Sequence, residues 1–185
     1  MAKDRRAVET RSAAAIFAVN ERVNQMLLER LDPAAWRTKP EGEVRTIAAI
    51  VTHVHNVRAK WVRLNAPQVG VPVQLNRASC TQDAARAGLA ESALACARLL
   101  ELVENGGVRE FRRDGWGAAW TTGMGPVGME MVCYMVAHEA HHRGQVCMLA
   151  HQMGFELPKE VTSGMWSWER LWDEGRGGVR WMKYR

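Results

Sequence analysis

The sequence lacks the cysteine spacings that structural zinc modules and disulfide-bonded domains require. It contains no CxxC pair, and its four cysteines are Cys80, Cys96, Cys133 and Cys147. Cys133 and Cys147 fall on one predicted helix about 21 Å apart, which is too far for a disulfide bond between them. We therefore expect reduced thiols in the core.

Long apolar runs and a strong excess of one charge are also missing. No stretch approaches the roughly 20 apolar residues of a membrane span, and Lys3–Arg6 are followed by Glu9 and Arg11 instead of an apolar signal core. The formal net charge is only +5, and the basic C-terminal end is typical of a solvated tail. The sequence has no recognition-helix pattern and no mixture of aromatic and basic residues typical of nucleic-acid binding. We expect a cytoplasmic protein with no membrane partner and no nucleic-acid partner.

Alternating strand patterns are absent, and apolar residues instead recur every three or four positions. This period predicts amphipathic α-helices. With 185 residues, 47% of them hydrophobic, the chain can form one domain with a substantial core. The predicted helices cover residues 5–31, 43–64, 81–104 and 126–153. The expected fold class is therefore all-α, a four-helix bundle.

Proline, glycine and threonine mark the predicted helix ends. Pro33 follows the first helix, Thr81 is the expected cap of the third, and Gly154 ends the fourth. Residues 65–80 contain two prolines and no helical period. This stretch predicts a long crossover between the second and third helices.

Two segments lie outside the predicted bundle. Residues 108–126 are rich in glycine and tryptophan, and they predict either a loop packed over the bundle end or a short irregular hairpin. Such long connections are often functional. We expect the bundle to span residues 1–158. Residues 159–185 then form a Trp-rich C-terminal extension with a short fifth helix, packed on the bundle or on the second subunit of a homodimer.

The fourth predicted helix carries His138 and His142, four residues apart. Residues at this spacing stand above one another on one helix face. Neutral imidazole suits zinc, nickel, copper or iron, and two imidazoles buried without partners would cost a few kcal/mol. His141 could replace His142 as the partner of His138, although direct stacking favours His142. Gly144 would allow either a close approach of another backbone or tight helix packing.

A third nitrogen would have to come from His53 or His55 on the second predicted helix. The two are about 200° apart around a helix, so both cannot point into one site. His53 continues the apolar stripe through Ile50 and Val57 and is favoured as the inward residue. Periodicity alone leaves the choice between them open.

Glu139 follows His138 as it would in the HExxH motif of zinc peptidases. The glutamate is the only match to that motif beyond the histidine pair, so a peptidase is not expected. Glu139 is predicted to face solvent, and Glu139 and Tyr134 are candidates for a supporting role around the site. No general base can be recognised from the spacing.

The segment HEAHHRGQV, together with a histidine on an earlier helix followed by NVRAKW, resembles the DinB/YfiT-like family of four-helix-bundle proteins. The resemblance covers about residues 10–158. It implies a divalent metal ion, zinc or nickel with iron or manganese as alternatives, held by His53, His138 and His142. Trp61 matches a position at which many members carry an aromatic residue.

The resemblance also implies a function. Some relatives are transferases or isomerases that use a low-molecular-weight thiol, and others resemble metal-dependent hydrolases. The expectation is a metal-dependent enzyme acting on a small-molecule substrate, with a transferase that activates a small thiol as the leading hypothesis. The alternatives are a metal-dependent hydrolase and a non-catalytic metal-binding or stress-related binding module.

Overall fold

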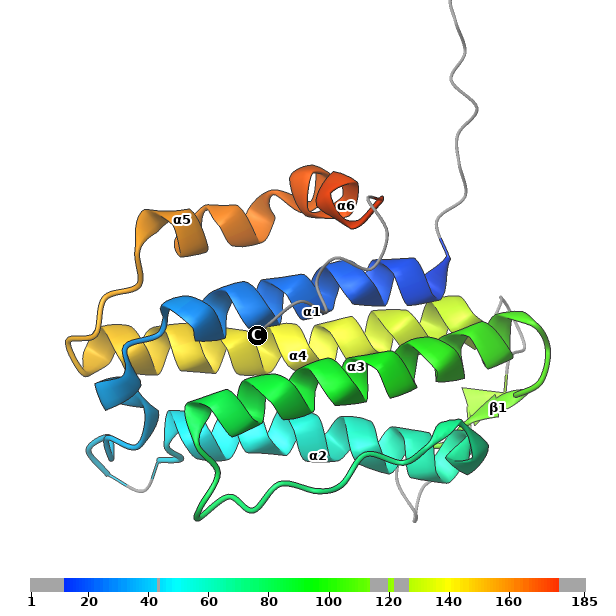
Figure 1. The fold of residues 1–185 in the computed structure, drawn as a ribbon, viewed down its shortest axis with the longest axis horizontal. Coiled ribbons are helices and arrows are strands. Elements are labelled where there is room, and N and C mark those ends of the chain that lie inside the picture. Colours follow the sequence, from blue (N-terminus) through cyan, green and yellow to red (C-terminus); the bar gives the residue numbers. More distant parts are fainter. Residues whose placement is uncertain (1–11, 43, 114–119, 122–126, 177–185) are drawn as a thin grey trace, which may run out of the picture.

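Four long helices lie alongside one another and form what we call the helical core (Figure 1). They are α1 (Ala13–Arg30), α2 (Ile47–Asn65), α3 (Gln82–Glu104) and α4 (Val127–Gln152). The computed structural model describes residues 12–42, 44–113, 120–121 and 127–176. The predicted all-α class is confirmed by this mostly helical chain.

Three of these helices begin at a side-chain cap. The hydroxyl oxygens of Ser12, Thr46 and Thr81 each accept a hydrogen bond from a backbone amide three residues later. Such a cap satisfies one of the amides that a helix start leaves without a partner. The predicted cap at Thr81 is therefore confirmed, and α2 begins after Thr46 instead of at residue 43. Residues 1–11, where the first helix was predicted to begin, lie outside the described part of the chain.

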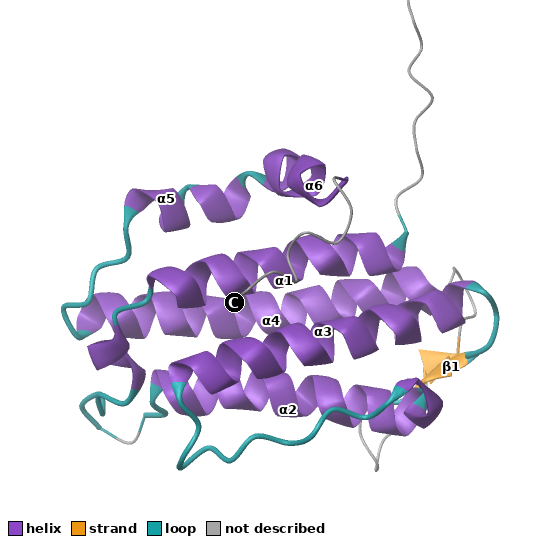
Figure 2. Cartoon of the chain, viewed as in Figure 1, coloured by secondary structure: helices purple, strands orange, loops and turns teal. Residues whose placement is uncertain are grey.

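The segment between α2 and α3 runs back along the helical core, so α2 and α3 point in the same direction (Figures 1 and 2). Asn56 on α2 holds this segment in place. Its side-chain amide donates to the Leu75 carbonyl over 3.0 Å, and its side-chain oxygen accepts from the Leu75 amide over 2.8 Å. The connection is thus fixed against the helix beside which it runs.

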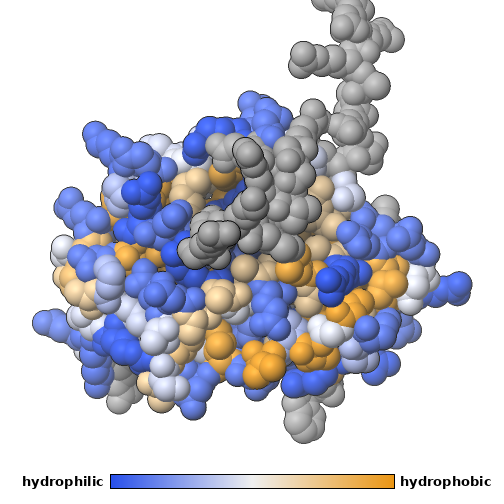
Figure 3. All heavy atoms as spheres, in the orientation of Figure 1, coloured by the Kyte–Doolittle hydropathy of each residue, from blue (hydrophilic) through white to orange (hydrophobic). Residues whose placement is uncertain are grey.

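The apolar interior falls into two large clusters along the helical core. One surrounds Trp61, Phe17 and Phe111, and the other surrounds Leu27, Ile47 and Trp36. A group of buried polar side chains also lies inside the helical core, and it is described with the site below. The outer face in Figure 3 is mostly hydrophilic, with small hydrophobic patches between.

The Gly/Trp-rich segment contains a short hairpin. Strand β1 (Glu110–Phe111) pairs antiparallel with β2 (Trp120–Thr121), with Glu110 opposite Thr121 and Phe111 opposite Trp120. Phe111 is buried in the cluster around Trp61. Of the two alternatives for this segment, the described residues match the hairpin, and residues 114–119 and 122–126 lie outside them.

The C-terminal segment lies alongside α1 (Figure 1). It comprises α5 (Lys159–Thr162), a 3₁₀ turn (Gly164–Trp166) and α6 (Trp168–Arg176). Leu171 is buried against Val19 and Val23 of α1, and the Arg22 guanidinium donates to the Leu171 carbonyl. Within the described ranges, no helix has both the length and the apolar content to cross a membrane.

Candidate metal centre

Three histidine rings meet between α2 and α4. His53 comes from α2, and His138 and His142 come from consecutive turns of α4. One nitrogen of each ring lies within 4.8 Å of the others, and the ring centroids of His138 and His142 are 4.6 Å apart. Nitrogens that bind one zinc ion at about 2.0–2.1 Å in a tetrahedral site are about 3.4 Å apart, so small rotations of the imidazoles would bring all three to one ion. The cluster could therefore hold one divalent ion.

Aromatic side chains form one wall of the cluster. Trp61, two turns after His53 on α2, is fully buried and meets the His138 ring edge-on at a centroid distance of 5.3 Å. Tyr134, one turn before His138, stacks on it at 6.4 Å. These rings restrict the rotation of the imidazole, which limits the orientations that a ligand at this position can adopt.

Gln145 fixes the orientation of His142. The Nδ1 of His142 lies 2.8 Å from the Gln145 side-chain oxygen, one turn later on the same helix. An amide oxygen only accepts hydrogen bonds, so Nδ1 carries the proton and donates it. The lone pair of the neutral ring is then on Nε2, which leaves that nitrogen free to bind an ion.

One nitrogen of His138 has no protein partner among the described residues. Nδ1 of His138 is buried and makes no hydrogen bond within the described part of the chain. A buried polar atom in this state costs free energy unless another partner satisfies it. Coordination of an ion by this imidazole would offset such a cost, so the donor set fits a bound metal.

Burial keeps these histidines neutral. Burial first, and then the charges of His142, His138, Arg45 and Arg77, lower the pKa of His53 to about 4. Burial is also the main cause that lowers the pKa of His138 to about 4 and that lowers the pKa of His142. Neutral imidazole is the form that binds metal ions, so all three rings are in the binding form near neutral pH.

A comparison with models of protein families identifies the family of this chain. The model of the DinB family matches residues 8–168. The chain belongs to the DinB family. The match includes all three clustered histidines and ends at the first residue of α6. No curated protein and no solved structure gives a match.

In this DinB-family chain the two histidines of α2 occupy different environments. His55 is only 1% exposed, and its two ring nitrogens lie 2.8 Å from the carbonyl oxygens of Gly88 and Val73. His53 is half-buried and faces the cluster. The prediction that only one of them can reach the site agrees with this arrangement. The preference for His53 as the residue that faces the site agrees with the cluster, although His55 is the more deeply buried of the two because α3 and the 66–81 segment cover the opposite side of α2.

The position of Glu139 differs from the expected one. It was predicted to face solvent but is 1% exposed. The next residue on a helix is turned by about 100°, which directs Glu139 away from the histidines and toward α1 and α2. There it forms an ion pair with Arg58 at 2.6 Å and accepts hydrogen bonds from the side-chain amides of Asn20 and Asn24.

We call this group the buried charge network, comprising Asn20, Glu21, Asn24, Arg58, Glu139 and Arg143. Burial raises the pKa of Glu139, but Arg58 and the amide donors outweigh burial, and the net pKa is lowered. For Arg58, burial lowers the pKa, and Glu139 and Glu21 raise it by more. Both groups of the pair are therefore ionised. Sequence reasoning missed this network, although Asn20 and Asn24, four apart on an otherwise apolar stripe, were a detectable signal.

The surroundings of His141, His142 and Gly144 in the HHRG segment bear on two other expectations. His141 is exposed, and the cluster contains His142 instead, so the preference for His142 agrees with the geometry. Gly144 has open space around it, with no atom within 4 Å of an added Cβ. Neither close backbone approach nor tight helix packing explains this glycine.

Proposed function

We propose that this DinB-family protein is a metal-dependent enzyme that binds one divalent ion through His53, His138 and His142. The observation that carries the proposal is the number of ligands. Among the described residues, the cluster contains three candidate ligands and no fourth His, Cys, Asp or Glu. Structural zinc sites are closed by four protein ligands, whereas catalytic sites keep a position open.

The reaction we propose is transfer of a low-molecular-weight thiol to a small electrophilic substrate. An ion in this site would act as a Lewis acid that lowers the pKa of a thiol or a water molecule. The chain contributes a positive surrounding, because Arg45 and Arg77 are near His53 and Lys60 is near His138. These cations would favour a thiolate over the neutral thiol. The thiol itself is implied by the family resemblance, and zinc or nickel remains our proposed metal.

We also propose how the molecule is organised around this site. Residues 1–158 would form a DinB-type four-helix bundle with a crossover between α2 and α3, and residues 159–185 would form an extension packed on it. A homodimer is proposed as the assembled state. The partners we propose are a small-molecule substrate and a thiol, without nucleic acid or membrane.

The metal site is tested by elemental analysis of untagged protein. Wild type should contain close to one divalent ion per chain, and His53→Ala and His142→Ala should lose most of it, because two neutral ligands bind much more weakly than three. His151→Ala, at an exposed position on the same helix, should retain the wild-type content. His55→Ala should retain the metal as well, although its lost backbone contacts should lower stability. Absence of metal in wild type after reconstitution would contradict the proposal.

A second assay separates the catalytic alternatives. Metal-loaded protein is mixed with a small thiol and an aryl chloride, and formation of the thioether with release of chloride is followed. Thioether formed by wild type but not by His142→Ala supports a transferase, and hydrolysis of an aryl ester without any thiol supports a metal-dependent hydrolase. Stoichiometric metal without either activity would support a non-catalytic metal-binding or stress-related binding module.

A further inference from the structure

A pocket lies next to the three histidines, between the start of α2 and the end of α4. Its volume is about 830 Å³, which is within the range of small-molecule sites. Ile50, one turn before His53, and Gln145, the residue bonded to His142, both line it. We call it the α2–α4 pocket. The three histidines do not line the pocket themselves, and Ile50 and Gln145 connect it to them.

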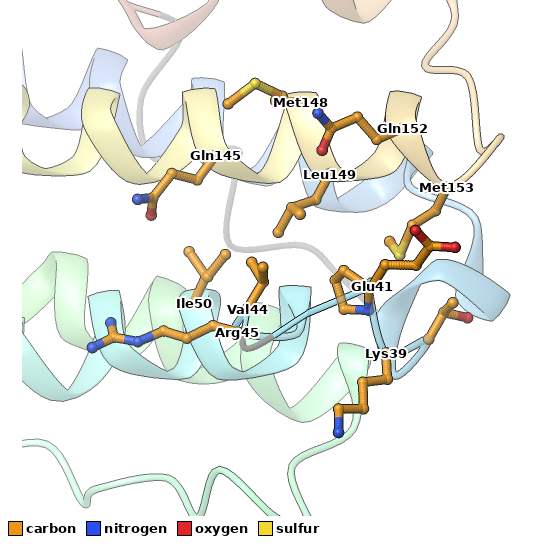
Figure 4. A pocket seen from close by; sticks show the side chains of 12 residues that line it. Lys39, Glu41, Val44, Arg45, Ile50, Gln145, Met148, Leu149, Gln152 and Met153 are labelled. Carbon is orange, nitrogen blue, oxygen red and sulfur yellow. The ribbon is translucent and has the colours of Figure 1, made fainter.

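The α2–α4 pocket has an apolar part and a polar part. Ile50 of α2 and Leu149 of α4 point toward each other across it (Figure 4), and Met153 and Val44 continue the same surface. Ile50 and Leu149 belong to the core and are only 2% and 7% exposed, whereas Val44 and Met148 are 48% and 57% exposed and offer apolar surface to a ligand. Walls of this kind favour a ligand with an aliphatic or aromatic body.

The side of the pocket near the histidines carries one charged lining residue, Arg45. In Figure 4 the Arg45 side chain extends toward the side of Gln145, whereas Lys39 and Glu41 lie together at the other side. Arg45 is also close enough to His53 and His142 to contribute to the lowering of the pKa of both. Within the described part of the chain, Arg45 has no ion-pair partner. The guanidinium is therefore available to a ligand.

We propose that the α2–α4 pocket binds a small organic carboxylate, with the carboxylate on Arg45 and the apolar body against Val44 and Met148. A guanidinium pairs with a carboxylate through two parallel hydrogen bonds. Among the described residues that line this side of the pocket, Arg45 alone is charged, and its one positive charge matches a carboxylate better than a phosphate dianion. This proposal names the substrate class of the site described above and rests on the proposed function only for the role of the ion.

The test uses the full chain in metal-free and metal-loaded forms, titrated calorimetrically with octanoate, octanamide and hexyl phosphate. Octanoate should bind both forms, and octanamide should bind at least fivefold more weakly. Arg45→Gln should weaken octanoate by about fivefold to tenfold, as expected for loss of a hydrogen-bonded charge in a partly open site. Arg63→Gln, on an exposed position of the same helix, is the matched control and should bind as wild type.

Chain length tests the apolar part of the pocket. From butanoate to octanoate, affinity should rise by up to about fourfold for each added CH₂ group, as expected for burial of a methylene. A flat series would overturn the proposed position of the body. Equal binding of octanoate and octanamide, tighter binding of hexyl phosphate, unchanged binding by Arg45→Gln, or no binding would overturn the carboxylate assignment.

Failure of this proposal can be distinguished from failure of the metal site. Octanoate binding that depends on Arg45 in a protein without metal would support the pocket and contradict the metalloenzyme. Stoichiometric metal in wild type that is lost in His53→Ala, combined with no octanoate binding, would support the metal site and contradict the pocket.

Discussion

Glu139 and Arg58 are charged side chains enclosed by protein on all sides. Their relative exposures are 0% for both side chains, and two hydrogen bonds from Arg58 to Glu139 measure 2.6 and 2.7 Å. Ions buried in this way are stable only when their partners stay in place, because removing one leaves the other without solvent or counter-charge. The pair joins α2 to α4 one residue after His138, so it also sets the rotation of α4 about its axis.

Glu139→Gln should therefore lower the free energy of unfolding by about 3 kcal/mol, because it leaves Arg58 with a reduced counter-charge in the interior. Urea denaturation of metal-free protein measures the change. Glu29→Gln is the control, because Glu29 lies 3.9 Å from Arg86 in a pair at the surface and should change the free energy by less than about 1 kcal/mol. Equal effects of the two substitutions would contradict the role of the buried pair.

At the scale of elements, α3 is kept close to α2 by a glycine. An added Cβ at Gly88 would lie 2.8 Å from Cδ1 of Leu75 and 3.2 Å from Nδ1 of His55. Leu75 can rotate away, but His55 is held between two carbonyl oxygens, each 2.8 Å from one of its ring nitrogens. The close approach also lets the Gly88 carbonyl accept a bond from His55.

Gly88→Ala should destabilise the protein by about 1 to 2 kcal/mol, since the strain on His55 exceeds the gain in helix propensity. Gly144→Ala places the same change on α4 in open space. It should leave stability unchanged or raise it by up to about 1 kcal/mol. Thermal or urea unfolding of both variants gives the comparison, and a stabilised Gly88→Ala would show that α3 can move away from α2.

Elements whose signals are local were predictable from sequence. The start of α3 at Thr81 follows from a cap and an apolar stripe within a few residues. The environments of His55 and Glu139 were not predictable in this way. Each depends on partners far along the chain, namely the carbonyls of Gly88 and Val73 for His55, and Asn20, Asn24 and Arg58 for Glu139. Periodicity predicts which residues share a helix face. The packing of the other elements determines which residues that face contacts.

On the scale of the whole molecule, the extension is anchored by Leu171, which is 3% exposed against α1. Leu171→Ala should lower the free energy of unfolding by about 2 to 3 kcal/mol if the extension unfolds together with the helical core. Trp166→Ala, at a side chain 83% exposed, should change it by less than about 0.5 kcal/mol. Urea denaturation tests both, and a silent Leu171→Ala would mean that the extension opens independently.

Stability of the whole metal-free protein should also depend on pH through the site. The pKa of His53 and of His138 is about 4 in the folded chain, against an ordinary value of 6.5. Between these values the unfolded chain binds more protons, so the free energy of unfolding should fall as the pH is lowered from 6.5 to 4. Urea midpoints measured with a chelator present should show this slope, and His53→Gln should reduce it. A slope equal to wild type in that variant would contradict the assignment.

The fixed rotation of α4 has a consequence for the choice of ion. Rotation of α4 about its axis would bring His138 and His142 to new positions, but it would also move Glu139 and break its buried pair with Arg58, so the two histidines can adjust to an ion only through their side-chain torsions. The protein would therefore impose the ligand geometry, and the ion would have to accept it. Zinc has no geometric preference of electronic origin and tolerates such an imposed arrangement. An ion that requires a strict coordination geometry would bind less well, because α4 cannot rotate to provide it. The buried pair between Glu139 and Arg58 would then help to determine which metal the proposed site accepts.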